Sequence, residues 1–300
     1  MSITKRQNCD DNLKLLAAQR KIYSEVKNLI GTQVALSFPI AGISVALIIF
    51  YPQLKNYVAL WGIFMLCLDL FFLTPKINEK RLCAAKVQEL FDTKVLNLPW
   101  NELLADKKPN SEIIFEKSSE YKENPKRPLK DWYPTIIDKI PEIYAVIICQ
   151  RTNVWWDSEV RRKYASLLTI IIVIIALSII AFAIYDNRNL FDFLVYLLAP
   201  LSSTFVFCYR QIKEHRKTAD LLDKLREKSD NIWLNILNKK ITPRKLKENS
   251  RVLQDIIFDH RKRNIPVFDF FFTLYRNKHE KLTNNTAEEY VNEYLKKNRE

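Results

Sequence analysis

The stretch ASLLTIIIVIIALSIIAFAI, residues 165–184, contains 20 apolar or small hydroxyl side chains and no charge. At about 1.5 Å of rise per residue, a helix of this length covers roughly 30 Å, close to the thickness of the hydrocarbon core of a bilayer. A helix also satisfies its own backbone polar groups, which a segment in hydrocarbon requires. The stretch therefore predicts a transmembrane span and places the chain among membrane proteins.

Three further stretches have the same character. They are VALSFPIAGISVALIIFY at 34–51, YVALWGIFMLCLDLFFL at 57–73 and LFDFLVYLLAPLSSTFVFC at 190–208. Each is long enough to cross a bilayer once, although the second also fits a buried helix of a soluble protein because it is short and contains Asp69. The short links PQLKN and YDNRN join the four stretches in pairs, so we expect two antiparallel hairpins.

The distribution of basic residues predicts the orientation. Each short link holds one basic residue, Lys55 or Arg188, whereas clusters lie after the second and fourth stretches and before the third. These clusters are Lys76, Lys80, Arg81, Arg161, Arg162, Lys163, Arg210, Lys213, Arg216 and Lys217. By the positive-inside rule, both termini and the segment between the hairpins lie in the cytoplasm. The net charge of +13 is unevenly distributed, and the basic C-terminal region 209–300 favours attraction to anionic lipid over binding of a nucleic acid polymer. Binding of an anionic nucleotide is a third alternative.

The expected fold class is mainly α, a polytopic membrane protein with four transmembrane helices in two hairpins plus a mostly helical cytoplasmic domain. The expected segments are an N-terminal cytoplasmic helix (1–31), the first hairpin (32–74), a cytoplasmic insert (75–164), the second hairpin (165–208) and a basic C-terminal helical region (209–300). We expect the last span to continue as a helix to about residue 238, a new helix capped by Thr242 with Pro243 at its first position, and a short strand at EIIFE, 112–116.

No combination of residue types in the sequence indicates an enzyme active site, a cofactor site or a metal site, and we expect none. The three glycines lie in or beside the first hairpin, so a glycine-rich phosphate loop is excluded from the cytoplasmic parts. The three histidines form no HExxH motif, and the five cysteines form no CxxC pair, which suits a reducing cytoplasm. Residues 1–30 contain no apolar core of a signal peptide, so we expect the first apolar stretch to remain as an anchor.

A candidate ligand site lies in CQRTNVWWDSEVRRKY, 149–164, because tryptophan stacks on bases and arginine pairs with phosphate. The tryptophans and Arg161 equally fit interfacial anchors before a span, and Arg151 fits a salt bridge with a carboxylate. The aromatic turns LPWN and DWYP either pack as a core or line a pocket with Arg151. The candidate ligand residues are Trp100, Trp132, Tyr133, Gln150, Arg151, Asn153, Trp156 and Arg161.

A second candidate site consists of polar residues inside the predicted spans. Asp69 is a carboxylate in hydrocarbon, which usually faces a bundle interior or water, although its place near the cytoplasmic end also fits snorkelling. Ser202, Ser203 and Thr204 follow Pro200 and fit either hydrogen bonding at a kink or a polar pore lining. We assign these four residues a hypothetical role in a pore or gate.

The whole pattern resembles a known family. The motifs are AAQRKIYSEVK at 17–27, VQELFDTKVLNLPWN at 87–101, DWYP at 131–134 and CQRTNVWWDSEVRRKYA at 149–165. Together with two hairpins around a cytoplasmic insert, they resemble the SMODS-associating four-transmembrane effector family over most of residues 8–240. The resemblance implies a role in cyclic-oligonucleotide antiphage signalling (CBASS), in which a SMODS-class cyclase makes a nucleotide second messenger. It also implies an effector that perforates or depolarises the inner membrane, so that the infected cell dies before phage matures.

We therefore expect a multi-pass protein of the bacterial inner membrane that senses a cyclic oligonucleotide and disrupts the bilayer, causing abortive infection. Because four spans are too few to enclose a wide pore, a homo-oligomer is expected. The alternatives are a small ion channel or transporter, which favours polar residues along several spans, and a membrane scaffold for cytoplasmic partners. The family resemblance assigns no ligand-contacting residue, so the proposed pocket rests on the residue types alone.

Overall fold

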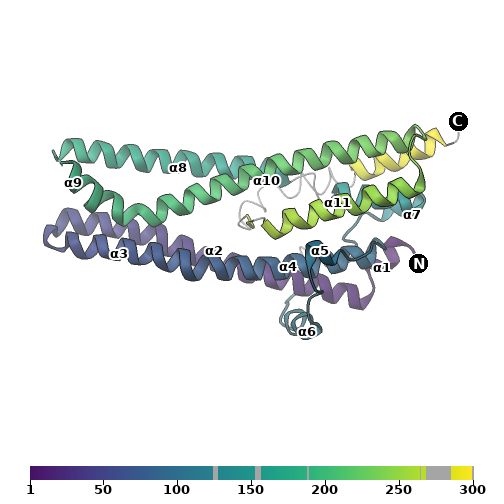
Figure 1. The fold of residues 1–300 in the computed structure, drawn as a ribbon, viewed down its shortest axis with the longest axis horizontal. Coiled ribbons are helices and arrows are strands. Elements are labelled where there is room, and N and C mark those ends of the chain that lie inside the picture. The colour runs from purple at the N-terminus through teal and green to yellow at the C-terminus, as the bar shows by residue number, and fades with distance from the viewer. Residues whose placement is uncertain (124–127, 153–156, 188, 264, 268–284, 299–300) are drawn as a thin grey trace. The chain divides into compact units, whose positions relative to one another are not determined.

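The structure, a computed structural model, describes residues 1–123, 128–152, 157–187, 189–263, 265–267 and 285–298 (Figure 1). All regular secondary structure in these ranges is helical, which confirms the predicted mainly α class. The chain forms two compact units. The polar unit consists of Met1–Ser24, Lys80–Arg161 and Lys217–Glu300, and the membrane unit consists of Glu25–Glu79 and Arg162–Arg216.

The helices include two π-helical segments, η2 and η4, and two 3-10 segments, η1 and η3. In chain order the elements are α1 (Ile3–Gln7), α2 (Asp10–Phe50), η1 (Pro52–Leu54), α3 (Lys55–Leu68), η2 (Asp69–Leu73), α4 (Thr74–Val95), α5 (Glu102–Ala105), α6 (Ser111–Ser119), η3 (Thr135–Lys139), α7 (Glu142–Thr152), α8 (Asp157–Tyr185), α9 (Leu190–Asp192), η4 (Phe193–Leu198), α10 (Ala199–Leu237), α11 (Pro243–Arg263) and a helix at 285–297.

The membrane unit is built from the predicted apolar stretches. Among the described residues, three helices are long and apolar enough to cross a bilayer, at Pro52–Val95, Ser158–Tyr185 and Leu190–Leu237. The remaining predicted span, 34–51, lies almost entirely in α2, and Figure 1 shows α2 and α3 as the two arms of a hairpin. Apolar side chains on α8 such as Ile170, Ile174 and Leu177 are exposed, as expected of a surface covered by hydrocarbon.

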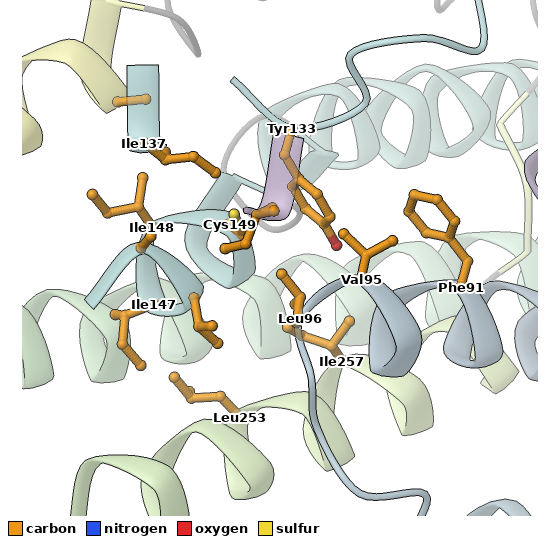
Figure 2. Packing of buried hydrophobic residues seen from close by; sticks show 14 of the residues in the cluster. Phe91, Val95, Leu96, Tyr133, Ile137, Ile147, Ile148, Cys149, Leu253 and Ile257 are labelled. Atoms are coloured by element: carbon orange, nitrogen blue, oxygen red, sulfur yellow. The ribbon is translucent and has the colours of Figure 1, made fainter. Parts of the chain in front are cut away.

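The polar unit has an apolar core that joins α4, η3, α7 and α11. Figure 2 shows Phe91 and Val95 of α4 close to Tyr133, with Ile147 of α7 and Leu253 of α11 completing the same cluster. The ring of Phe91 lies 6.3 Å from that of Tyr133 in a stacked arrangement and 6.2 Å from that of Trp132. The DWYP turn therefore packs into the core, which was one of the two alternatives for this motif.

Two expectations for the C-terminal region are confirmed. The last span continues as a helix to Leu237 in α10, and α11 begins at Pro243. The hydroxyl of Thr242 accepts a hydrogen bond from the backbone N–H of Lys245 at 3.3 Å, as expected of a helix N-cap.

The predicted strand at EIIFE is wrong, because residues 112–116 lie in helix α6. A strand needs a hydrogen-bonded partner, whereas a helix satisfies its own backbone. The helical turn also places Ile113 and Ile114 together against the core and leaves Phe115 exposed. The predicted N-terminal helix and the first span are continuous, since α2 runs from Asp10 to Phe50.

Replacement of Phe91 by alanine should strongly destabilise the polar unit. The side chain is fully buried, and the loss of a buried phenylalanine costs about 3–5 kcal/mol through lost burial and the remaining cavity. We expect a clear fall in the thermal unfolding midpoint of the detergent-purified protein. Phe115→Ala is the matched control, because this phenylalanine is 72% exposed, and equal midpoints for the two variants would contradict the described core.

Candidate functional site

Arg151, at the C-terminal end of α7, forms the salt bridge that was the structural alternative for it. Its Nε donates to Oδ1 of Asp230 on α10 at 2.5 Å, and its side chain is 8% exposed. The guanidinium carbon lies 4.6 Å from the ring centroid of Tyr290, whose hydroxyl donates to the same Asp230 oxygen at 2.7 Å. Burial and the hydrogen bond to Asp230 raise the pKa of Tyr290 above its ordinary value. Three separate helical segments therefore meet at one carboxylate.

Aromatic contacts hold the helix 285–297 beside Arg151. The Trp233 ring centroid lies 5.1 Å from that of Tyr290, and the indole N–H of Trp233 donates to Glu293 at 3.2 Å. Tyr144 of α7 contacts Tyr294 with 5.1 Å between ring centroids. This helix therefore covers the Arg151–Asp230 pair with aromatic side chains.

The other candidate ligand residues have separate partners. The side-chain amide of Gln150 is buried and donates to the carbonyl of Ser250 at 2.7 Å. The indole N–H of Trp100 donates to the carbonyl of Asp106 at 2.8 Å, and Nη1 of Arg161 donates to the carbonyl of Ile265 at 3.1 Å. Trp132 and Tyr133 lie in the core as described above, whereas Asn153 and Trp156 lie outside the described residues.

The sequence interpretation missed a buried polar network between α4 and α11. Glu89 and Asp92 lie three residues apart on α4, so both face the same neighbour. Arg251 and Gln254 of α11 donate to Glu89 at 2.8 and 2.7 Å, and Gln254 also donates to Asp92 at 3.0 Å. Nη1 of Arg261 donates to the same Asp92 oxygen at 2.5 Å.

The network also reaches the DWYP turn and the N-terminus. The hydroxyl of Tyr133 donates to Asp92 at 2.7 Å. Gln7 of α1 exchanges two hydrogen bonds with the backbone of Tyr133, at 2.7 and 3.1 Å. The sequence signal for this network was the pair of carboxylates among the apolar residues of VQELFD, 87–92, because a buried carboxylate requires partners.

Cationic side chains surround Tyr23 and His260 inside the polar unit. Burial raises the pKa of Tyr23 to about 12, although the charges of Arg261, Arg81 and Arg161 oppose this shift. Burial and the charges of Arg161 and Arg261 lower the pKa of His260 well below its ordinary value. His260 is therefore neutral at pH 7. In the described ranges, no group of His, Cys, Asp and Glu side chains is arranged to hold a metal ion.

In the membrane unit, Asp69 has close polar partners. Its Oδ1 accepts from the amide of Gln33 on α2, and its Oδ2 accepts from Nη2 of Arg210 on α10. Thr74 lies within the same group, since its hydroxyl accepts from Nη1 of Arg210 at 2.6 Å and from Gln33 at 3.3 Å. The whole residue Asp69 is only 5% exposed, so its carboxylate is buried and paired, whereas a snorkelling carboxylate would reach the water.

The three hydroxyl residues of the last span differ in their surroundings. Ser202 donates to the carbonyl of Ala199 at 2.7 Å within its own helix, which fits the kink alternative. Ser203 is buried and lines a small cavity together with Gln33 and Asp69. Thr204 is fully buried.

These features can be compared with known proteins. The sequence pattern of the SMODS-associating 4TM effector domain matches residues 1–290, which includes both units. The chain belongs to the SMODS-associating 4TM effector family. A protein of Bacillus cereus (strain VD146), described as a probable CBASS effector molecule, is 26% identical over 284 residues, which are 91% of this chain and 92% of the relative. No solved structure matches the chain.

Membership of this family confirms the predicted four-span architecture. The family domain is described as having four transmembrane segments, and its match includes the apolar half of α2. The three long apolar helices together with α2 account for all four spans.

Glu89 makes the stability of the polar unit depend on pH. Burial and the charge of Asp92 raise its pKa from 4.5 to about 7, against the hydrogen bonds from Arg251 and Gln254. The folded chain thus keeps a proton that the unfolded chain has lost over this range, so stability is full below pH 4.5 and falls as the pH rises through 7. At about 1.4 kcal/mol per pKa unit, the loss is on the order of 3 kcal/mol.

We expect Glu89→Gln to remove this dependence. The unfolding midpoint of the wild type should fall relative to that of Glu89→Gln between pH 5 and pH 8, as measured by thermal unfolding in detergent. Glu112→Gln, at an exposed glutamate of α6, should follow the wild type. Parallel pH profiles for the wild type and Glu89→Gln would contradict the assignment.

Proposed function

We propose that the protein is the membrane effector of a bacterial CBASS antiphage system. Its polar unit binds a cyclic oligonucleotide, and its membrane unit then permeabilises the inner membrane, so that the infected cell dies before phage matures. The observation that carries this proposal is the family match over residues 1–290, which extends through both units. The B. cereus relative supports it, because that protein is described as a probable CBASS effector. We propose that the effector acts without catalysis and without a cofactor.

The basic residues support a cytoplasmic position for the polar unit. Clusters of lysine and arginine flank the spans at 76–81, 161–163 and 210–217, whereas the two short links between spans contain one basic residue each. Cytoplasmic loops are enriched in such residues. We infer that both termini and the polar unit lie in the compartment in which a cyclase would release its product.

We place nucleotide sensing at Arg151. A phosphodiester offers an arginine the same paired acceptor oxygens as a carboxylate, so it can replace Asp230 as the partner of the guanidinium. Tyr290 contacts both Arg151 and Asp230, and this exchange would therefore loosen the helix 285–297 as well. Such a ligand has different affinities for the two arrangements, which is the requirement for shifting their populations.

We further propose that the active form is a homo-oligomer. Four spans enclose little space within one bundle, and apolar side chains such as Ile170, Ile174 and Leu177 of α8 are available to lipid or to another copy. Association of several copies would form a pathway across the membrane that one copy alone lacks.

Reconstitution in liposomes tests the function directly. The purified protein is incorporated into dye-loaded liposomes, and a panel of cyclic dinucleotides and trinucleotides is added. We expect one member of the panel to bind and to release the dye, whereas its linear form should not. Absence of binding and leakage with the whole panel would overturn the sensor hypothesis, and leakage that is independent of every nucleotide would favour a plain channel.

Arg151→Ala should weaken nucleotide binding at least tenfold, which corresponds to about 1.4 kcal/mol, because it removes the guanidinium that pairs with phosphate. The measurement is the dissociation constant of the active nucleotide by calorimetry in detergent. Arg244→Ala is the control, because this arginine is 93% exposed in a surface ion pair. Unchanged affinity of Arg151→Ala would place the pocket elsewhere in the polar unit.

A further inference from the structure

The membrane unit contains a polar group that connects its two hairpins. We call Gln33, Asp69, Thr74 and Arg210 the hairpin latch. The first three belong to α2, η2 and α4 of the first hairpin, and Arg210 belongs to α10, which continues the second hairpin. Both carboxylate oxygens of Asp69 are used, one by Gln33 and one by Arg210.

The latch is mostly shielded from solvent. The side chain of Asp69 is 7% exposed, that of Arg210 is 27% exposed, and Gln33 is buried. A carboxylate in such surroundings is stabilised only while its partners remain in place. Separation of the hairpins therefore requires Arg210 to leave Asp69, and any ligand that separates them must supply the free energy for this step.

A second contact between the same hairpins lies at Gly62 and Pro200. A Cβ atom on Gly62 would lie 2.5 Å from Cα of Pro200 and 2.7 Å from the carbonyl oxygen of Ala199. The backbones of α3 and α10 thus touch directly, with no side chain between them. Gly62 precedes Asp69 by seven residues, about 10 Å along a helix, and the contact is consequently distinct from the latch.

Irregular helix accompanies both contacts. The π-helical segment η2 begins at Asp69 itself, and η4 ends two residues before Pro200. π-Helical turns are rare and occur mostly at functional sites. The helix α8, which takes no part in either contact, is α-helical throughout.

A small cavity lies beside the latch. Its lining includes the polar residues Gln33, Asp69 and Ser203 and the apolar residues Met65 and Leu68. A polar-lined space next to a paired charge is a place that water can occupy once the charge is released.

We propose that the hairpin latch holds the membrane unit closed, and that its release allows the hairpins to separate about the Gly62–Pro200 contact and opens the polar lining to water. This inference rests on the proposed function, since it names the element on which an activating ligand acts. In this proposal, Asp69 and Arg210 keep the membrane unit inactive until a ligand binds. Gly62 and Pro200 form the point about which the hairpins separate.

The test uses the full chain in dye-loaded liposomes without any nucleotide. Asp69→Asn and Arg210→Gln each break the ion pair, and we expect each variant to leak at least tenfold faster than the wild type. The reversed pair, Asp69→Arg combined with Arg210→Asp, should return the leak to near the wild-type rate. Lys213→Gln is the matched control, because this exposed lysine lies one turn beyond Arg210 on α10, and it should leave the leak unchanged.

Two outcomes would overturn the latch. One is that the single variants leak no faster than the wild type at equal protein incorporation. The other is that the reversed pair leaks as fast as the single variants, which indicates general damage to the fold. Because no nucleotide is added, these outcomes are separate from failure of the sensor hypothesis, in which the wild type ignores every cyclic nucleotide while the latch variants still leak.

Discussion

The absence of water in the bilayer core is the constraint on which the structure depends. Backbone groups in hydrocarbon must be satisfied internally, and the apolar stretches are accordingly helical. The same constraint acts on Asp69, whose charge is tolerated where Arg210, Gln33 and Thr74 surround it. This buried ion pair connects the two hairpins of the membrane unit. A buried ion pair between helices that are mostly apolar has a large influence on which arrangement is preferred.

The polar unit follows the same physical rule with a different result. Glu89 and Asp92 are buried in an apolar core, and α11 supplies Arg251, Gln254 and Arg261 to them. These contacts fix the rotation of α11 against α4, because each donor must meet its acceptor. Arg151 and Asp230 act similarly between α7 and α10. Burial of charge thus determines which helices pair, whereas the apolar core around Phe91 provides the bulk of the packing.

Properties that depend on neighbours in the chain were predictable from the sequence. The four spans, the continuation of α10 to Leu237 and the Thr242 cap follow from hydrophobic length and local hydrogen bonding. The pairing of Asp69 with Arg210 joins residues 141 positions apart, and no local pattern selects Arg210 from the other basic residues near it. The error at 112–116 has a different cause. The apolar run was interpreted as a strand, but a strand also needs a partner strand, and the local sequence does not show whether one is present. For Arg151 the sequence indicated a paired arginine, but the choice between phosphate and Asp230 depends on tertiary structure.

The π-helical segment η2 has a consequence for the length of the chain. A π-turn closes its hydrogen-bonded ring over one residue more than an α-turn, so Asp69–Leu73 contains in effect a one-residue insertion. Loss of one residue there would rotate the following part of α4 by about 100° relative to α3. The number of residues between 69 and 73 therefore determines whether the hydroxyl of Thr74, at the start of α4, faces Gln33 and Arg210.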